Sequence, residues 1–265
     1  MAEEQLVPMK EQVYLDPRPK EWFDQFHHRS RTKWPEPMYS LVRTSVTLYG
    51  LVFFRETCIS SDKIPQSGPV ILAPNHFSFM DHFFLGSFTR RKVRFMAKSQ
   101  LFSGPLKFIY THGGVFPVRR GHRDAEAFIT AHTILENGGC IAMYPEGGRS
   151  RTGDLSERAK PGIGRLALES GAAIVPVAIH GSAKVRNWKK LQFPKVVVQY
   201  GDPMRWERVE DPTRDQQQAV ADEIFEEIRE LYFGLEKLGK RGVVERIREE
   251  RRALRRSRRK RTAAA

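Results

Sequence analysis

The first residues that could do chemistry are a histidine and an aspartate in the segment Asn75–Asp81, where four residues separate His76 from Asp81. An imidazole is the natural proton acceptor near neutral pH. It works best when a carboxylate on one ring nitrogen fixes the ring and stabilises the positive charge that forms as the other nitrogen takes a proton. The pair therefore predicts general-base catalysis, although the same spacing also fits a structural histidine.

The spacing of these two residues does not place them on one face of a continuous helix. It fits His76 in the loop that leaves a strand and Asp81 in the first turn of the next helix, with Ser78 as the expected N-cap. The apolar run Val70–Ala73, just before them, is the strand that this arrangement needs.

Two later segments carry groups that suit phosphate. The first is a strand that ends in two arginines, and a guanidinium there can reach phosphate from the edge of the sheet where α/β sites gather; its candidate is Arg120. The second has two glycines, whose backbone N–H groups can approach an anion closely, and an arginine that matches phosphate with a forked donor. Its phosphate candidates are Gly147, Gly148 and Arg149, and Glu146 beside them could bind a hydroxyl or brace an arginine. Each segment alone also fits a solvated strand end or an ordinary turn.

Between residues 70 and 200 the chain alternates short apolar runs with longer mixed segments. Short, nearly continuous apolar strands separated by helices are typical of an α/β domain with buried strands. The expected strands are Val70–Ala73, Val93–Ala97, Gly114–Val118, Cys140–Tyr144, Ala173–Ile179 and Val196–Tyr200. The expected helices are Asp81–Thr89, Pro105–Thr111, Asp124–Glu136 and Pro161–Ser170.

Both ends of the chain differ from this central part. Residues 1–37 read as an extended arm with one short helix, and residues 38–58 as a helix. The uncharged stretch of that helix, Thr44–Phe54, has 11 residues, against roughly 20 needed to cross a bilayer. Aromatic and cationic residues ahead of it favour a position at the bilayer surface; the alternative is an ordinary core helix. From residue 212 to 239 apolar residues recur every three or four positions, which predicts an amphipathic helix.

Charge is concentrated at the C-terminal end. Eight of the 14 net positive charges lie in residues 251–265, which contain no acidic residue. Such a surplus attracts phosphate on lipid headgroups, nucleic acids or small molecules. The two cysteines, Cys58 and Cys140, have no metal-ligand spacing and indicate no disulfide scaffold, which fits a reducing compartment.

Taken together and in this order, the motifs resemble those of the lysophosphatidic acid acyltransferase family. That family has an Asn-His-x4-Asp block, a Gly-x-x-Pro-Val-x-Arg-like block, a Phe-Pro-Glu-Gly-Thr-Arg-Ser block and a Val-Pro-Val block. The corresponding segments here are Asn75–Asp81, Gly114–Arg120, Tyr144–Ser150 and Val175–Val177. Tyr144 stands where the family has phenylalanine, and Gly148 where it has threonine, which leaves the identity of the acceptor open.

The resemblance implies an α/β fold: one acyltransferase domain with a mixed, largely buried sheet flanked by helices. We expect this domain over residues 61–211, after an arm and a membrane-interface helix over 1–60. An amphipathic helix over 212–239 and a basic helical tail over 240–265 complete the expected organisation.

The resemblance also implies an activity. A fatty acyl group would move from a thioester of coenzyme A or acyl carrier protein to the hydroxyl of lysophosphatidic acid, or alternatively of glycerol 3-phosphate or another lysolipid. His76 would be the base and Asp81 its orienting partner, with no cofactor or metal. The acceptor phosphate would lie against Lys98, Arg120, Glu146, Gly147, Gly148 and Arg149. The expected location is the cytoplasmic face of a membrane rich in anionic lipid, reached without spanning it.

Two other functions would use some of the same residues. His76, Asp81 and the adjacent His82 could be metal ligands of a phosphoesterase, but the sequence shows no second cluster of ligands. The basic tail could bind nucleic acid, but the rest of the chain shows no zinc finger, RNA-recognition signature or clear helix-turn-helix. No nucleic-acid partner is therefore expected, and a solvated tail without a partner is the remaining alternative.

Overall fold

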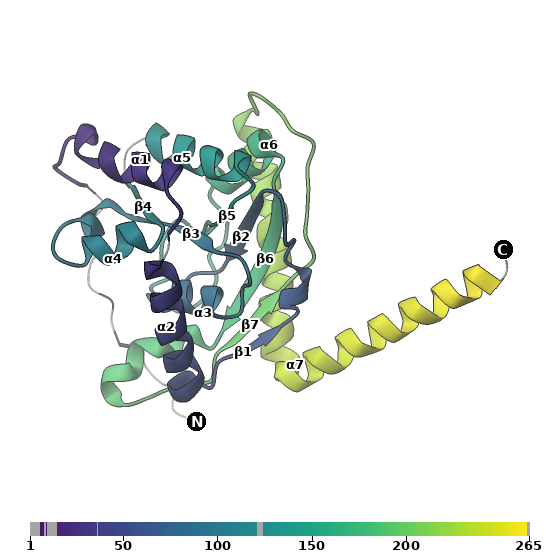
Figure 1. The fold of residues 1–265 in the computed structure, drawn as a ribbon. Coiled ribbons are helices and arrows are strands. Elements are labelled where there is room, and N and C mark those ends of the chain that lie inside the picture. The colour runs from purple at the N-terminus through teal and green to yellow at the C-terminus, as the bar shows by residue number, and fades with distance from the viewer. Residues whose placement is uncertain (1–5, 8, 10–14, 36, 121–123, 264–265) are drawn as a thin grey trace.

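A computed structural model describes residues 6–7, 9, 15–35, 37–120 and 124–263 (Figure 1). The strands are β1 (Thr57–Ile59), β2 (Val70–Pro74), β3 (Val93–Lys98), β4 (Val115–Val118), β5 (Cys140–Ala142), β6 (Ala173–His180) and β7 (Val197–Tyr200). The helices are α1 (Asp24–Thr32), α2 (Met38–Phe54), α3 (Asp81–Ser87), α4 (Lys107–His112), α5 (Ala125–Glu136), α6 (Gly162–Ser170) and α7 (Arg214–Ala263). Short 3₁₀ helices are η1 (Lys20–Phe23), η2 (Ser61–Lys63), η3 (Ser99–Phe102) and η4 (Ser182–Lys190).

The strands form one seven-stranded sheet in the order β1-β7-β6-β2-β5-β3-β4. Only β6 and β7 pair in antiparallel fashion, and the other neighbours are parallel. β2 lies at the centre between β5 and β6, so the loops that follow these three strands leave the sheet near one another. The mixed, largely buried sheet that the sequence predicts is confirmed.

Side chains alternate between the two faces of the sheet, as the two-residue period of a strand requires. In β2, Ile71 packs toward α5, α6 and α7, whereas Val70 and Leu72 pack on the other face with residues of α2 and α3. Both clusters are fully buried, which explains why the central strands read as continuous apolar runs. The face with α2 and α3 carries the site described below.

One predicted element differs from the structure. The helix expected over residues 38–58 ends at Phe54, because Arg55 adopts a left-handed conformation (φ 46°, ψ 41°). The chain then turns back, and Thr57–Ile59 becomes β1, an edge strand that pairs with β7. Three residues are too few to show an alternating pattern, so the sequence alone does not distinguish β1 from the end of the helix. The sheet thus begins within the segment assigned to the N-terminal arm.

The N-terminal arm is described only in part. Its one expected helix is present as η1 and α1, and Phe23 and Phe26 from these turns pack against Phe102 and Ala97. The predicted extended segment before them falls mainly on residues 1–5, 8 and 10–14, which lie outside the described residues. Among those that are described, no helix is both long and apolar enough to cross a bilayer.

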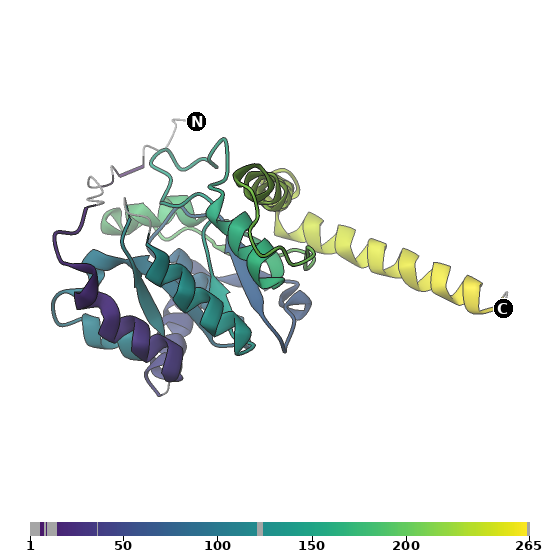
Figure 2. The same ribbon diagram turned by 90° about the horizontal axis from the view of Figure 1, so that it is seen from above.

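The C-terminal helix α7 has two parts joined at Gly239, whose backbone is not helical (φ 63°, ψ 174°). The first part packs on α6 and β6, with Ile224 and Ile228 buried against the sheet. The second part contacts the sheet edge through Val243 and then extends away from the body, on the side opposite α4 (Figures 1 and 2). Side chains of residues 258–265 lie outside the described part of the chain.

The contact between α6 and α7 gives a test of this packing. A Cβ on Gly164 would lie 1.9 Å from the backbone oxygen of Gln217, so Gly164→Ala must push the helices apart. We expect a loss of about 1–3 kcal/mol in unfolding free energy, measured by urea denaturation. Gly234→Ala is the control, because its Cβ meets nothing closer than 3.6 Å and should stabilise α7 by about 0.5–1 kcal/mol. Equal effects of the two substitutions would contradict this account.

Candidate active site

The loop after β2 brings His76 and Asp81 together in the interior. His76 Nδ1 lies 2.9 Å from Asp81 Oδ2, and the two side chains are 5% and 0% exposed. Because a carboxylate oxygen only accepts, Nδ1 carries the proton in this pair, and Nε2 is left as the basic nitrogen. His76 lies in the loop and Asp81 begins α3, as the spacing of the two residues predicts.

Asp81 Oδ2 also accepts the backbone N–H groups of Phe77 and Ser78, both at 2.7 Å. Three donors therefore converge on one oxygen, which stabilises the ionised carboxylate in a buried position. Ser78 does not cap α3 in the predicted way. Its hydroxyl accepts the N–H of Met80, the residue that precedes the helix.

Aromatic rings surround the imidazole of His76. The ring of Tyr144 stacks on it at a centroid distance of 3.9 Å, and the ring of His82 meets it edge-on at 5.2 Å. Burial lowers the pKa of His76, against the opposing effect of the hydrogen bond and charge of Asp81, and the nearby Arg149 lowers it further. Burial also lowers the pKa of His82, to about 3. His76 is therefore held in the neutral form that can accept a proton.

Three further contacts fix the backbone around His76. Its N–H donates to Glu146 Oε1 at 2.7 Å, and its carbonyl accepts the N–H of Ser150 at 2.9 Å. One residue earlier, the side chain of Asn75 accepts the N–H of Ile179 at 2.7 Å and donates to the carbonyl of the same residue at 3.3 Å. The loop after β2 is thus tied to the loop after β5 and to the end of β6.

Arg186, in η4, adds a second tie that the sequence did not single out. Its guanidinium donates to the carbonyls of Phe77, Ser150 and Arg151. It therefore joins the His76 loop to the loop after β5. No motif marks this arginine, and the only available signal was a cation shortly after β6, which a solvated helix would also give.

Glu146 does not lie in the phosphate site in the way the sequence predicts. Oε1 takes the N–H of His76, and Oε2 takes the hydroxyl of Ser156 at 3.0 Å. Burial raises the pKa of this carboxyl to about 7, against the lowering effect of these hydrogen bonds. Its observed contacts orient the His76 loop, and neither oxygen is directed to a cation.

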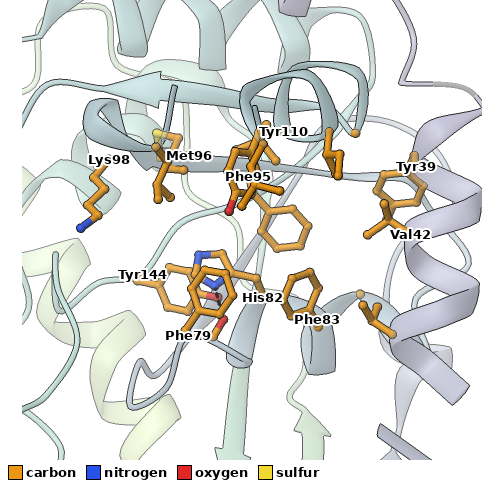
Figure 3. Close-up of a pocket in the computed structure, with 18 of the residues that line it drawn as sticks. Tyr39, Val42, Phe79, His82, Phe83, Phe95, Met96, Lys98, Tyr110 and Tyr144 are labelled. Carbon is orange, nitrogen blue, oxygen red and sulfur yellow. Dashed lines mark hydrogen bonds between the residues drawn. The ribbon is translucent and has the colours of Figure 1, made fainter. Parts of the chain in front are cut away.

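His76 lines a pocket with a volume of about 420 Å³. Figure 3 shows Lys98 at one end and Tyr39 and Val42 of α2 at the other, with Phe79, Phe83, Phe95 and Tyr110 along the two sides. The pocket is thus long and mostly apolar, with a cation at one end. The side chains from α2 and α4 that close it come from segments that sequence reasoning did not connect to the site.

Lys98, Arg120 and Arg149 all line this pocket, at the ends or exits of β3, β4 and β5. Burial lowers the pKa of Lys98, and the charges of Arg149 and Arg120 lower it further, so the three cations lie close enough to repel one another. In the described part of the chain, neither Lys98 nor Arg149 forms an ion pair with an acidic side chain. Such a cluster favours an anion between its members. Gly147 adopts φ 69° beside it, in the turn that carries Gly148 and Arg149.

Other chemistry finds less support. Over the described residues, no group of three or more His, Cys, Asp or Glu side chains is arranged to hold a metal ion. His76, Asp81 and His82 therefore do not form such a group. Cys140 is buried in β5, and burial raises the pKa of its thiol to about 12. It is therefore not an activated nucleophile.

The raised pKa of Glu146 gives a prediction with a defined sign. The folded state holds the proton up to about pH 7, whereas the unfolded chain releases it near pH 4.5, so Glu146 destabilises the fold progressively as pH rises through this interval. Glu146→Gln keeps the acceptor for His76 but carries no charge. Its unfolding free energy relative to the natural chain should rise by up to about 3 kcal/mol between pH 4.5 and 8.

The control is Glu157→Gln, at an exposed glutamate of the same loop, which should show no comparable rise in urea-melt series at each pH. A flat difference for Glu146→Gln across the interval would show that this carboxyl is ionised throughout.

Known proteins share sequence similarity with the part of the chain that forms this site. Residues 55–180 match the family model described as Acyltransferase. The chain is 31% identical over 149 residues to a 1-acyl-sn-glycerol-3-phosphate acyltransferase of Borreliella burgdorferi, covering 55% of this chain and 58% of the relative. It is 26% identical over 164 residues to a chloroplastic enzyme of the same name from Arabidopsis thaliana, covering 60% of this chain and 42% of the relative.

A solved structure agrees in fold. The 1-acyl-sn-glycerophosphate acyltransferase of Thermotoga maritima superposes with a TM-score of 0.57 at 22% identity, covering 80% of this chain and 88% of that one. The chain spans about half the length of the curated relatives it matches. The matched residues 55–180 include the His76 loop, the three cations and the Glu146 turn. This segment of the chain is therefore similar to the acyltransferase family, in sequence and in the residues that line the site.

Proposed function

We propose that this chain transfers a fatty acyl group from an acyl thioester to the free hydroxyl of lysophosphatidic acid and so forms phosphatidic acid. The observation that carries the proposal is the position of His76, bonded to the buried carboxylate of Asp81, in an apolar pocket with a cationic end. The apolar walls suit a hydrocarbon chain, and the cations suit a phosphomonoester. The relatives named above act on an acceptor that combines both groups.

In the proposed reaction, His76 Nε2 takes the proton of the acceptor hydroxyl as the hydroxyl oxygen attacks the thioester carbonyl. The resulting tetrahedral oxyanion collapses, the carbon–sulfur bond breaks, and the imidazolium returns the proton to the departing thiolate. Asp81 stabilises the imidazolium between these two steps and holds the ring in place. The buried carboxylate does this without moving, because three donors already fix Oδ2.

The acceptor phosphate is placed against Lys98, Arg120 and Arg149, beside the turn of Gly147 and Gly148. These three basic side chains bring positive charge to the phosphate dianion. The thioester comes from coenzyme A or acyl carrier protein, and no cofactor takes part. We favour a single displacement without an acyl-enzyme, because the buried thiol of Cys140 has a pKa raised to about 12.

Removing the base tests the mechanism. His76→Ala should lower kcat by about 10²–10⁴-fold, because general-base help is lost, and Asp81→Asn should lower it as well through the wrong ring tautomer. The measurement is transfer of a radiolabelled acyl group to lysophosphatidic acid, glycerol 3-phosphate and other lysolipids, resolved by lipid chromatography. Circular dichroism must show an intact fold for both variants. Most of the rate retained in a folded His76→Ala protein would rule out His76 as the base.

The proposed function also places the chain on a membrane surface. The outer side of α2 exposes Leu48, Val52 and Phe53, and the α4 segment exposes Leu106 and Phe108. Leu106 also lines the pocket that contains His76, and exposed apolar side chains of this kind mark an interaction surface. We propose that this face rests on the cytoplasmic leaflet, with the basic tail drawn toward anionic lipid.

Liposome sedimentation separates the two contributions. Val52→Glu should weaken binding to neutral and anionic liposomes alike, because it puts a charge into the apolar face. Truncation after Glu250 keeps the packed Val243 but removes the charges of residues 251–265. It should weaken binding only to anionic liposomes, by an amount that falls with added salt. If neither the substitution nor the truncation changes the fraction of protein that sediments with liposomes, this surface and the tail have no part in membrane binding.

A further inference from the structure

A second cavity lies next to the first. Its volume is about 360 Å³, and it lies among the last turns of α2, the loop before α3 and η4. Its lining is Met9, Tyr49, Phe54, Ser78, Phe79, Met80, Arg149, Val185 and Arg186. Neither the base nor the phosphate site accounts for this space.

Phe79 and Arg149 line both cavities, so they form the partition between them. The guanidinium of Arg186 donates hydrogen bonds to three backbone carbonyls. Arg149 forms no hydrogen bond or ion pair within the described residues, and its charge reaches His76, Lys98 and Arg186. A phosphate bound at Arg149 would therefore have an apolar space on each side.

The proposed reaction brings together two hydrocarbon chains, one on the thioester and one on the acceptor. A single apolar pocket of about 420 Å³ has to hold the acyl group that reacts, because that pocket contains His76. The tail of the acceptor needs a different place, on the far side of the phosphate from the base. The second cavity is in that position, and its walls are mainly apolar side chains.

We propose that the second cavity binds the hydrocarbon tail that the acceptor already carries, with the phosphate at Arg149 and the free hydroxyl directed to His76. The inference rests on the proposed function and adds the place in the structure where the tail of its phosphate-bearing acceptor is held. Tyr49 and Phe79 are 37% and 44% exposed, so the cavity opens beside the exposed apolar face of α2. A tail can thus pass from a bilayer into the cavity without crossing water.

Neighbouring positions on α2 allow a matched test. Tyr49 lines the second cavity, Val46 lines the first, and Leu48 lines neither, so the same change to glutamate can be made at all three. The assay measures kcat/KM for acceptors with a 16-carbon and a 4-carbon tail, and for long and short acyl thioesters. Each methylene buried in an apolar site strengthens binding by about fourfold, so the ratios of long to short chains report on each cavity.

We expect Tyr49→Glu to lower the acceptor ratio by about tenfold or more, since a charge then lies in the path of the tail. Val46→Glu should lower the donor ratio instead. Leu48→Glu shares any loss of bilayer binding but should change neither ratio. An acceptor ratio for Tyr49→Glu equal to that for Leu48→Glu would overturn the proposal.

Photolabelling gives a readout that does not depend on turnover. The probe is a lysophosphatidate with a diazirine at the end of its tail, irradiated with the full chain and mapped by mass spectrometry. Labels in residues 49–54 or 185–186 support the inference, and labels confined to residues 95–110 overturn it. If the chain transfers acyl groups but the labels are misplaced, only the inference fails. If no phosphate-bearing acceptor is acylated at all, the proposed function fails with it.

Discussion

The site depends on the burial of one carboxylate. Asp81 has no exposed surface, and an ionised carboxylate without partners there would cost several kcal/mol. Its oxygen Oδ2 meets this cost with three donors, two of them backbone N–H groups of its own loop. All three donors belong to consecutive residues, 76 to 78, so the loop has to fold around the carboxylate to supply them. The position of the His76 ring is therefore a consequence of how the loop stabilises a charge.

A loop under this constraint has to be supported from outside. Asn75 ties it to the end of β6, Glu146 and Ser150 tie it to the exit of β5, and Arg186 joins both loops from η4. All of these groups leave the sheet near the same edge because β2 lies between β5 and β6 in parallel register. The sheet order thus brings together residues that are far apart in the chain. The guanidinium groups that face His76 come from the same edge.

The regular part of the fold could be predicted from the sequence, since strands buried on both faces leave continuous apolar runs. β2, β3, β4, β5, β6 and β7 fall within the expected runs or differ by a residue or two. The pairing of His76 with Asp81 followed from the exit of β2 into α3. The three-residue β1 and the left-handed Arg55 left no comparable signal.

Side-chain direction was harder to predict than residue choice. Glu146 lies in a motif next to Arg149, but its oxygens contact the backbone of His76 and the hydroxyl of Ser156. The hydrogen bonds of Arg186 go to backbone carbonyls. Every residue has such a carbonyl, so the sequence does not indicate which ones are bound. The walls of both cavities combine α2 with segments more than 20 positions away, and such contacts are set by packing in three dimensions. Motif order predicted the family model that residues 55–180 match, and packing determined how each motif is used.

The non-helical residue Gly239 divides α7 into a part that packs in the core and a part that extends from the body. Before it, α7 is part of the core; after it, Val243, Val244 and Ile247 pack at the sheet edge, and Arg251 pairs with Asp62. A Cβ at Gly239 would meet nothing within 4 Å, but the backbone there has φ 63°, so a single residue in a conformation disfavoured for other amino acids sets the heading of the arm. A change of backbone conformation at this one residue would therefore re-aim the arm without touching the residues around His76.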